Sequence, residues 1–164
     1  IKVLQAVYAY LESGEDNLEK GLNHLMESVD KMKDLFVWQL SFLIETKRFA
    51  ENRIEENKRK NLPTKEDLNP NMRYVNNRVI KALENNKQLR KEEERLKINW
   101  ADHQDIVRGY YNKMRETEEY KQYMSDPVDN FDHDKKFIVK MINEYFADLE
   151  VLQDFYEEKS IFFD

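Results

Sequence analysis

The stretch from Lys31 to Lys60 limits the fold more than any other part of the sequence, because it predicts a helix that is buried from several sides. Its apolar residues recur at the helical spacings of three and four: Met32, Leu35, Phe36, Leu40, Leu43, Phe49, Ala50 and Ile54. Between Leu35 and Ile44 only Gln39 and Ser41 are polar. Other helices must surround this part, so we expect Trp38 in the core. Towards Lys60 the pattern becomes charged, and the helix is expected to emerge into solvent.

The low content of glycine and proline favours long helices over tight turns. The chain has three of each among 164 residues, and 37% of its residues are charged. No stretch of useful length alternates with period two, the pattern of a half-buried strand. The sequence therefore predicts an all-α fold, a helical bundle of five to seven helices. We divide it into amino-terminal helices at 1–60, a linker at 61–71 and a further helical region at 72–164.

Two amphipathic helices are predicted ahead of the central stretch. One, over residues 1–13, has an apolar face made of Val3, Leu4, Val7, Tyr8 and Leu11. The other, over 17–30, repeats the pattern with Leu18, Leu22, Leu25, Met26 and Val29. A single helix from Asn17 to Lys60 would be about 65 Å long, whereas a compact domain of this size is about 40 Å across. We therefore expect a break near Ser28 to Asp30.

The linker at 61–71 holds two of the three prolines and leads into the further helical region. Asn69 and Pro70 are typical first residues of a helix, which would bury Met72, Val75, Val79, Leu83 and Leu89. The charged segment at 85–97 predicts a solvated helix or a turn. Two more helical stripes follow: Ile106, Val107, Tyr110, Tyr111 and Met114, then Phe137, Ile138, Met141, Ile142, Tyr145, Phe146, Leu149, Leu152 and Phe155.

The charge of the chain is unevenly distributed. The net charge is −6, yet residues 1–115 hold 22 of the 27 basic and 19 of the 33 acidic residues. The acidity is therefore a property of the last third, and the first two thirds could meet a polyanion. There is no cysteine, so disulfides and thiolate metal sites are excluded, and a cytoplasmic location is expected. No stretch is apolar enough to span a membrane.

No constellation of side chains in the sequence predicts catalysis. The histidines, His24, His103 and His133, lack the Glu-x-x-His spacing of helical di-iron sites. There is no P-loop, nucleophile elbow or dinucleotide fingerprint. We therefore expect a protein that is not an enzyme and needs no cofactor or metal.

Aromatic side chains next to basic ones are the remaining candidates for a binding site, because bases of single-stranded nucleic acid stack on aromatic rings. Tyr8 lies near Lys2, and Tyr74 lies between Arg73 and Arg78. The other tyrosines are spaced as core residues. The basic residues Lys47, Arg48, Arg53, Lys58, Arg59 and Lys60 alternate with acidic ones, which is typical of a solvated helix face.

Several stretches resemble the transcription antitermination factor NusB family. The opening IKVLQAVYAY is similar to the first helix of the family, and Leu4, Gln5, Ala6, Val7 and Tyr8 match its core pattern. The segment DLFVWQLSFLIETKRFAENRIEE is similar to the third helix. The segments at 68–80, 97–111 and 119–127 resemble an extended branch of the family with a long helical insertion.

The resemblance implies a NusB-like bundle that binds RNA. It implies a boxA-type single-stranded RNA element, a NusE-type ribosomal protein as partner and a role in the transcription elongation complex. The residues implied in RNA binding are Lys2, Gln5 and Tyr8. A rival interpretation is a helical protein-interaction module that does not bind RNA.

Two departures from the family pattern affect these expectations. The arginine-rich arm expected before the first helix is represented by Lys2 alone, and the carboxy-terminal half of the NusB bundle is not found before Asp164. We therefore interpret the sequence as an amino-terminal fragment. The first helix and the central helix should then carry apolar side chains with too few partners, and we expect either a surface for self-association into a homo-oligomer or an exposed apolar patch.

Overall fold

The computed structural model describes residues 2–12, 14, 17–146 and 150–159. All of its regular elements are helical, which confirms the all-α prediction. In order they are α1 (Lys2–Glu12), α2 (Leu18–Lys58), α3 (Lys65–Leu68), α4 (Arg78–Glu84), α5 (Lys87–Leu96), a 3₁₀ turn (Ala101–His103), α6 (Gln104–Glu116), α7 (Glu118–Ser125), α8 (Phe131–Lys140), a π-helical segment (Met141–Phe146) and α9 (Glu150–Lys159). The described residues thus hold more helices than the five to seven expected, because the second region divides into short ones.

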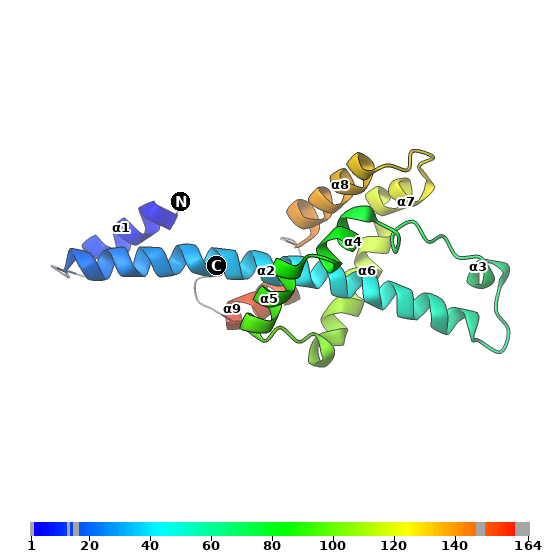
Figure 1. Ribbon diagram of the computed structural model, residues 1–164, viewed down its shortest axis with the longest axis horizontal. Helices are drawn as coiled ribbons and strands as arrows, with labels where there is room; N and C mark the ends of the chain where they lie inside the picture. The colour runs from blue at the N-terminus through cyan, green and yellow to red at the C-terminus, as the bar shows by residue number, and fades with distance from the viewer. Residues whose placement is uncertain (1, 13, 15–16, 147–149, 160–164) are drawn as a thin grey trace.

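Helix α2 is the axis of the molecule (Figure 1). Its 41 residues run without interruption, over about 60 Å at 1.5 Å per residue. The predicted break near Ser28 to Asp30 is wrong. No glycine or proline occurs between Gly21 and Pro63, and the hydroxyl of Ser28 donates to the Leu25 carbonyl within the helix, at 2.7 Å. The expectation assumed a compact shape, whereas the first half of α2 projects from the packed body.

Helix α1 lies alongside the projecting half of α2 (Figure 1). Tyr10 rests on Gly21: a Cβ at Gly21 would lie 2.8 Å from a ring carbon of Tyr10. The glycine therefore permits the close approach of the two helices. At the start of α2, the side chain of Asn17 accepts from the backbone N–H groups of Glu19 and Lys20 and caps the helix.

The core surrounds the second half of α2. Phe42 is fully buried, and its ring contacts Trp100, Tyr110 and Phe146 at centroid distances of 5.0, 5.2 and 5.3 Å. Trp38 is 7% exposed, as predicted. It meets Trp100 and Phe155 edge-on, both at 5.4 Å. The aromatic rings of the second region therefore close around α2.

The last predicted stripe is buried as well. Phe137, Ile138, Met141, Phe146, Leu152 and Phe155 are buried, while Ile142 and Tyr145 are partly buried against the core. Leu149 lies outside the described residues. The stripe is carried by α8, the π-helical segment and α9, which together cover one side of the body.

The prediction that Asn69 and Pro70 open a helix is wrong. Asn69 instead follows the last residue of α3, and α4 begins only at Arg78. Its cap is Asn77, whose side chain accepts from the backbone N–H groups of Val79 and Ile80. The apolar residues assigned to this region still face the core: Val75 and Leu89 are buried, and Met72, Val79 and Leu83 are partly buried.

A buried polar network joins α4, α7 and α8. Asp134 is 1% exposed. It accepts from the Tyr123 hydroxyl at 2.8 Å, from the Arg78 backbone N–H at 2.9 Å and from the Arg78 guanidinium at 3.1 Å. Asn77 donates to the Tyr123 hydroxyl at 3.0 Å. Because every member has a partner, the network fixes these helices to one another.

Candidate RNA-contact and protein-contact surfaces

Of the three predicted RNA-binding residues, Tyr8 is the one whose side chain the structure describes. It lies on α1 with 65% of its surface exposed. Lys2 and Gln5 belong to the same helix, but their side chains lie outside the described part of the chain. The ring of Tyr8 is thus available to a ligand and is not part of the core.

The interpretation of Tyr74 as a stacking residue is wrong. Tyr74 is 1% exposed, and its ring packs against Tyr120 and Phe137 with centroids 5.8 and 6.2 Å away. Burial raises the pKa of its phenol well above the ordinary value, so the side chain remains neutral. Although Arg73 and Arg78 flank it in sequence, both guanidiniums bond to protein groups: Arg73 to the Asp126 and Val128 carbonyls, and Arg78 to Asp129 and Asp134.

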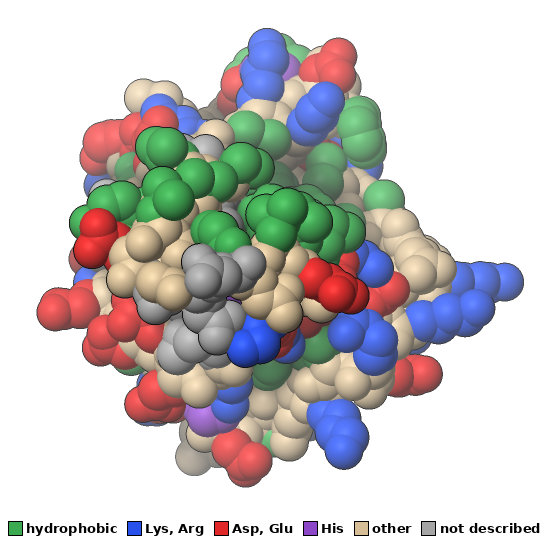
Figure 2. Space-filling model, turned by 90° about the vertical axis from the view of Figure 1, so that its left-hand side faces the viewer, with side chains coloured by type: hydrophobic (Ala, Val, Ile, Leu, Met, Phe, Trp, Pro, Cys, Tyr) green, Lys and Arg blue, Asp and Glu red, His purple; other side chains and the backbone are tan. Residues whose placement is uncertain are grey.

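Exposed apolar side chains gather on α1 and the first half of α2. Eleven of the seventeen large hydrophobic side chains that are exposed in the described residues lie there: Val3, Leu4, Val7, Tyr8, Leu11, Leu18, Leu22, Met26, Val29, Met32 and Phe36. Figure 2 views the molecule from this end, where hydrophobic side chains form a band. We call these eleven residues the apolar face. Its exposure confirms the expected exposed apolar patch for the first helix. For the central helix the expectation holds only at Met32 and Phe36, because the core covers the residues that follow.

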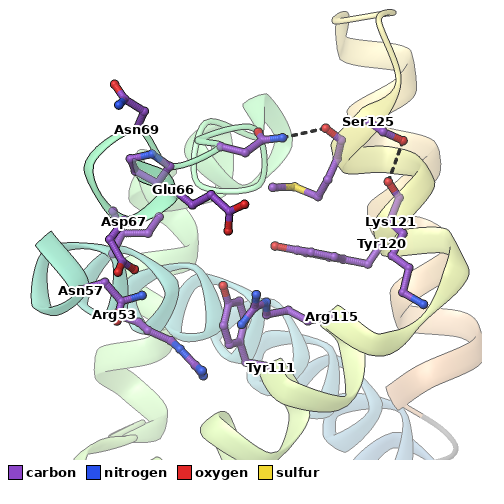
Figure 3. Close-up of a pocket in the computed structure, with 14 residues that line it drawn as sticks. Arg53, Asn57, Glu66, Asp67, Asn69, Tyr111, Arg115, Tyr120, Lys121 and Ser125 are labelled. Atoms are coloured by element: carbon purple, nitrogen blue, oxygen red, sulfur yellow. Dashed lines mark hydrogen bonds between the residues drawn. The ribbon is translucent and has the colours of Figure 1, made fainter. Parts of the chain in front are cut away.

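A cavity of about 660 Å³ opens at the other end of α2, between the last turns of α2, the α3 region, α6 and α7 (Figure 3). Arg53 and Arg115 place their guanidinium carbons 5.9 and 5.8 Å from the centroid of the Tyr111 ring. Arg53 is held by a 2.8 Å hydrogen bond to the side-chain oxygen of Asn112. Arg115 has no ion-pair partner among the described residues. We call this site the arginine cleft.

The polar groups of the arginine cleft differ in what they offer a ligand. In Figure 3 the carboxylate of Glu66 and the hydroxyl of Tyr120 point into the space, with Arg115 beside them. Burial raises the pKa of Tyr120, and the neighbouring Tyr111 raises it further, so its hydroxyl stays protonated. The cleft therefore sets the guanidinium of Arg115, which can hold an anion, beside a carboxylate and a hydroxyl.

Sequence reasoning missed the arginine cleft. Arg53 was assigned to a solvated helix face and Tyr111 to a core stripe. Tyr111 and Arg115 are four residues apart on one helix face, a spacing that could have drawn attention to the pair. The contact between Arg53 and α6 joins residues 59 positions apart, and no local pattern predicts it.

Lys47 does not belong to the solvated face that was predicted for the basic stretch. It is 5% exposed, and its ammonium lies 2.8 Å from both Glu51 and Glu84. Burial alone would lower the pKa of Lys47, but the hydrogen bonds to the two carboxylates outweigh burial and raise it. Lys47 therefore forms a buried ion pair that links α2 to α4, and its ammonium is not accessible to an external anion.

The histidines occupy separate places. His133 places Nδ1 3.1 Å from an Asp126 carboxylate oxygen, and the His103 ring packs edge-on against Phe155 at 4.7 Å. Within the described ranges, no group of three or more histidines and carboxylates is arranged to hold a metal ion. No described helix has the length and apolar character needed to cross a membrane.

Comparison of the chain with protein families, with curated proteins and with solved structures finds no match.

Proposed function

We propose that the chain is a non-catalytic RNA- and protein-binding factor of the NusB type, acting in transcription antitermination in the cytoplasm. It would bind a boxA-type single-stranded RNA together with a NusE-type ribosomal protein in the transcription elongation complex. The observation that supports this proposal most directly is the exposed ring of Tyr8. It lies on the helix whose sequence carries the resemblance to the family.

The proposed contacts on α1 follow from the chemistry of the three residues. A lysine at position 2 can neutralise one phosphate, and a glutamine at position 5 can bond a base edge through its amide. The ring of Tyr8 can stack on a base, an interaction worth about 1–3 kcal/mol per base. Stacking needs an accessible ring face, which the 65% exposure of Tyr8 provides.

The arginine cleft is a second candidate contact for the same strand. Gly21, which touches Tyr10 of α1, and Arg53 are 32 residues apart along α2. That separation corresponds to about 48 Å. One nucleotide cannot reach both places, so the two contacts would hold different parts of an RNA. Their contributions can therefore be measured with separate variants.

Titration of fluorescently labelled boxA-type RNA, with and without the NusE-type protein, tests the proposal. We expect Tyr8→Ala to weaken binding by about 5- to 100-fold, because one stacked base is lost. Tyr8→Phe keeps the ring and should bind like the wild type. A scrambled RNA of equal length is the control for sequence preference.

The salt dependence provides an independent test of the phosphate contacts. Each phosphate neutralised on a single strand contributes about −0.7 to the slope of log K against log salt. With Lys2 and two or three further basic residues engaged, the slope should be about −2. Lys2→Glu should reduce it. Unchanged affinity in both Tyr8→Ala and Lys2→Glu would show that α1 is not the RNA surface.

A second candidate function, a helical protein-interaction module without RNA binding, is favoured by the apolar face. Large exposed apolar patches are typical of protein-contact surfaces. The two functions are distinguished by the same titration. The module would bind boxA-type and scrambled RNA equally weakly, even with the NusE-type protein present.

A further inference from the structure

A regular apolar stripe runs along the first half of α2 and shares five of its six residues with the apolar face. Leu18, Leu22, Leu25, Val29, Met32 and Phe36 follow one another at alternating spacings of four and three residues. This is the heptad spacing of the a and d positions of a coiled coil, and it keeps a narrow apolar seam on one side of a helix. Leu25 is partly buried, and the other five are between 47% and 65% exposed. We call these six residues the heptad stripe.

The heptad stripe is complementary to itself in the antiparallel orientation. If two copies of α2 cross with their directions opposed, Leu18 can face Phe36 of the second copy and Leu22 can face Met32. Leu25 then faces Val29, so all six residues have an apolar counterpart, in six layers that the two-fold axis relates as three equivalent pairs. Such pairing of one surface with itself is what a two-fold dimer requires.

The charges beside the heptad stripe fit the same orientation. Glu19 and Lys33 lie on one flank, and antiparallel pairing brings Glu19 of one copy next to Lys33 of the other. The Lys33 ammonium, whose side chain is 60% exposed, already bonds Glu92 at 3.1 Å and is thereby held near this flank. In a parallel pair the same positions would instead face Gly21, Ser28 and Leu35 of the second copy, and neither charge would have an opposite partner.

The area available is sufficient for a stable pair. At about 100 Å² for each half-exposed side chain, the ten residues of the apolar face other than Tyr8, which is left free for RNA, amount to on the order of 1,000 Å². A standard protein interface needs about 800 Å² from each partner. The largest apolar patch of a typical monomer is only about 300–600 Å².

We propose that the chain forms an antiparallel homodimer through the heptad stripe of α2, with α1 of each copy flanking the contact. This inference goes beyond the RNA-binding function and does not depend on it. The occupant of the face is a second copy of this chain, because the stripe is matched to itself in spacing and charge.

Sedimentation equilibrium of the full chain between about 5 and 200 µM tests the dimer. The wild type should approach twice the monomer mass of 20.0 kDa, and Leu22→Glu with Val29→Glu should remain at the monomer mass. Asn23→Glu, on the opposite side of α2, is the matched control and should dimerise like the wild type. Far-ultraviolet circular dichroism and the fluorescence of Trp38 and Trp100 show that each variant is folded. A monomeric wild type, or a folded double variant that still dimerises, would overturn the proposal.

Cysteine cross-linking tests the orientation, since the chain has no cysteine of its own. Leu18→Cys and Phe36→Cys proteins should form a mixed disulfide when combined and oxidised, while each alone stays uncross-linked. A disulfide dimer of Leu18→Cys alone would show parallel pairing and contradict the antiparallel arrangement. Labelled-RNA binding by the monomeric double variant is measured separately, so a failure of the dimer and a failure of RNA binding remain distinguishable.

Discussion

The two halves of α2 have similar apolar patterns and opposite environments. Leu22, in the first half, is 53% exposed, whereas Phe42, in the second half, is fully buried. The difference comes from the rest of the chain. Helices between residues 78 and 159 gather around the second half. The first half is lined by α1, and α5 reaches only its end, through the ion pairs of Lys33 with Glu92 and of Asp34 with Arg95. A helical stripe thus shows which side of a helix needs a partner, and it does not show whether the same chain supplies one.

Hydrogen bonds made by side chains near the two ends of α2 also differ in their exposure to solvent. In the second half, Ser41 accepts from the indole N–H of Trp100 at 3.1 Å, and the buried Thr46 hydroxyl donates to the Phe42 carbonyl at 2.8 Å. These bonds are needed because burial removes the groups from water. The capping bonds of Asn17 at the start of the first half lie in solvent instead. Mutations should therefore have unequal effects on the two halves.

The largest expected difference is between two neighbouring aromatic residues of α2. Trp38→Ala should lower the free energy of unfolding by about 3–5 kcal/mol, because it leaves a cavity between Trp100 and Phe155. Phe36→Ala, at a residue 55% exposed, should cost below about 1 kcal/mol. Urea unfolding at one low protein concentration measures both. Equal costs would mean that the first half is packed as tightly as the second.

The two asparagine residues that cap α4 and α2 should differ less in the stability that their substitution costs. Asn77→Ala should cost about 2–3 kcal/mol, because the fully buried amide caps α4 and also donates to Tyr123. Asn17→Ala removes a solvent-exposed cap from α2 and should cost about 0.5–1 kcal/mol. Thermal or urea unfolding gives both values. A cost at Asn17 as large as that at Asn77 would show that the start of α2 is more constrained than its exposure indicates.

Local sequence patterns predicted the elements of the fold better than their boundaries. The burial of Trp38 followed from an all-round apolar run, which is a local property. The residue that caps α4 could not be predicted from a local pattern, because Asn69 and Asn77 are equally able to cap a helix. The choice between them depends on Tyr123, 46 residues beyond Asn77. The continuity of α2 was missed because the chain was assumed to be compact.

The candidate sites likewise fall into those that a local sequence pattern predicts and those that only the tertiary structure shows. The exposure of Tyr8 and of its apolar neighbours could be anticipated from stripes with too few partners. The arginine cleft could not, since it brings together α2, α3, α6 and α7, which are distant in sequence. The sequence also cannot show that Arg78 is engaged by Asp129 and Asp134. Ion pairs of this kind decide which basic residues remain available to an RNA.

The smallest expected effect is the loss of folding stability at low pH. It should arise from carboxyl groups in the part of the chain beyond residue 50. The described carboxyl groups whose pKa is lowered all lie beyond residue 50: Glu55, Asp67, Glu92, Glu119 and Asp129. Hydrogen bonds from the Tyr145 hydroxyl, at 2.6 Å, and from Lys140, at 2.9 Å, lower the pKa of Glu119 to about 2. The unfolded value is about 4.3. The contribution of Glu119 to stability is therefore complete above about pH 4.3 and is lost as the pH falls towards 2.

Glu119→Gln should lower the free energy of unfolding by less than about 1 kcal/mol at pH 7, because the site is close to solvent, and by nothing measurable near pH 2. Tyr145→Phe should reproduce part of the loss with the same pH dependence. Glu118→Gln, at a carboxylate whose side chain is 73% exposed and paired with Lys121, is the control and should change little at either pH. A loss at Glu119 that persists unchanged at pH 2 would show that the residue contributes through packing and not through its charge.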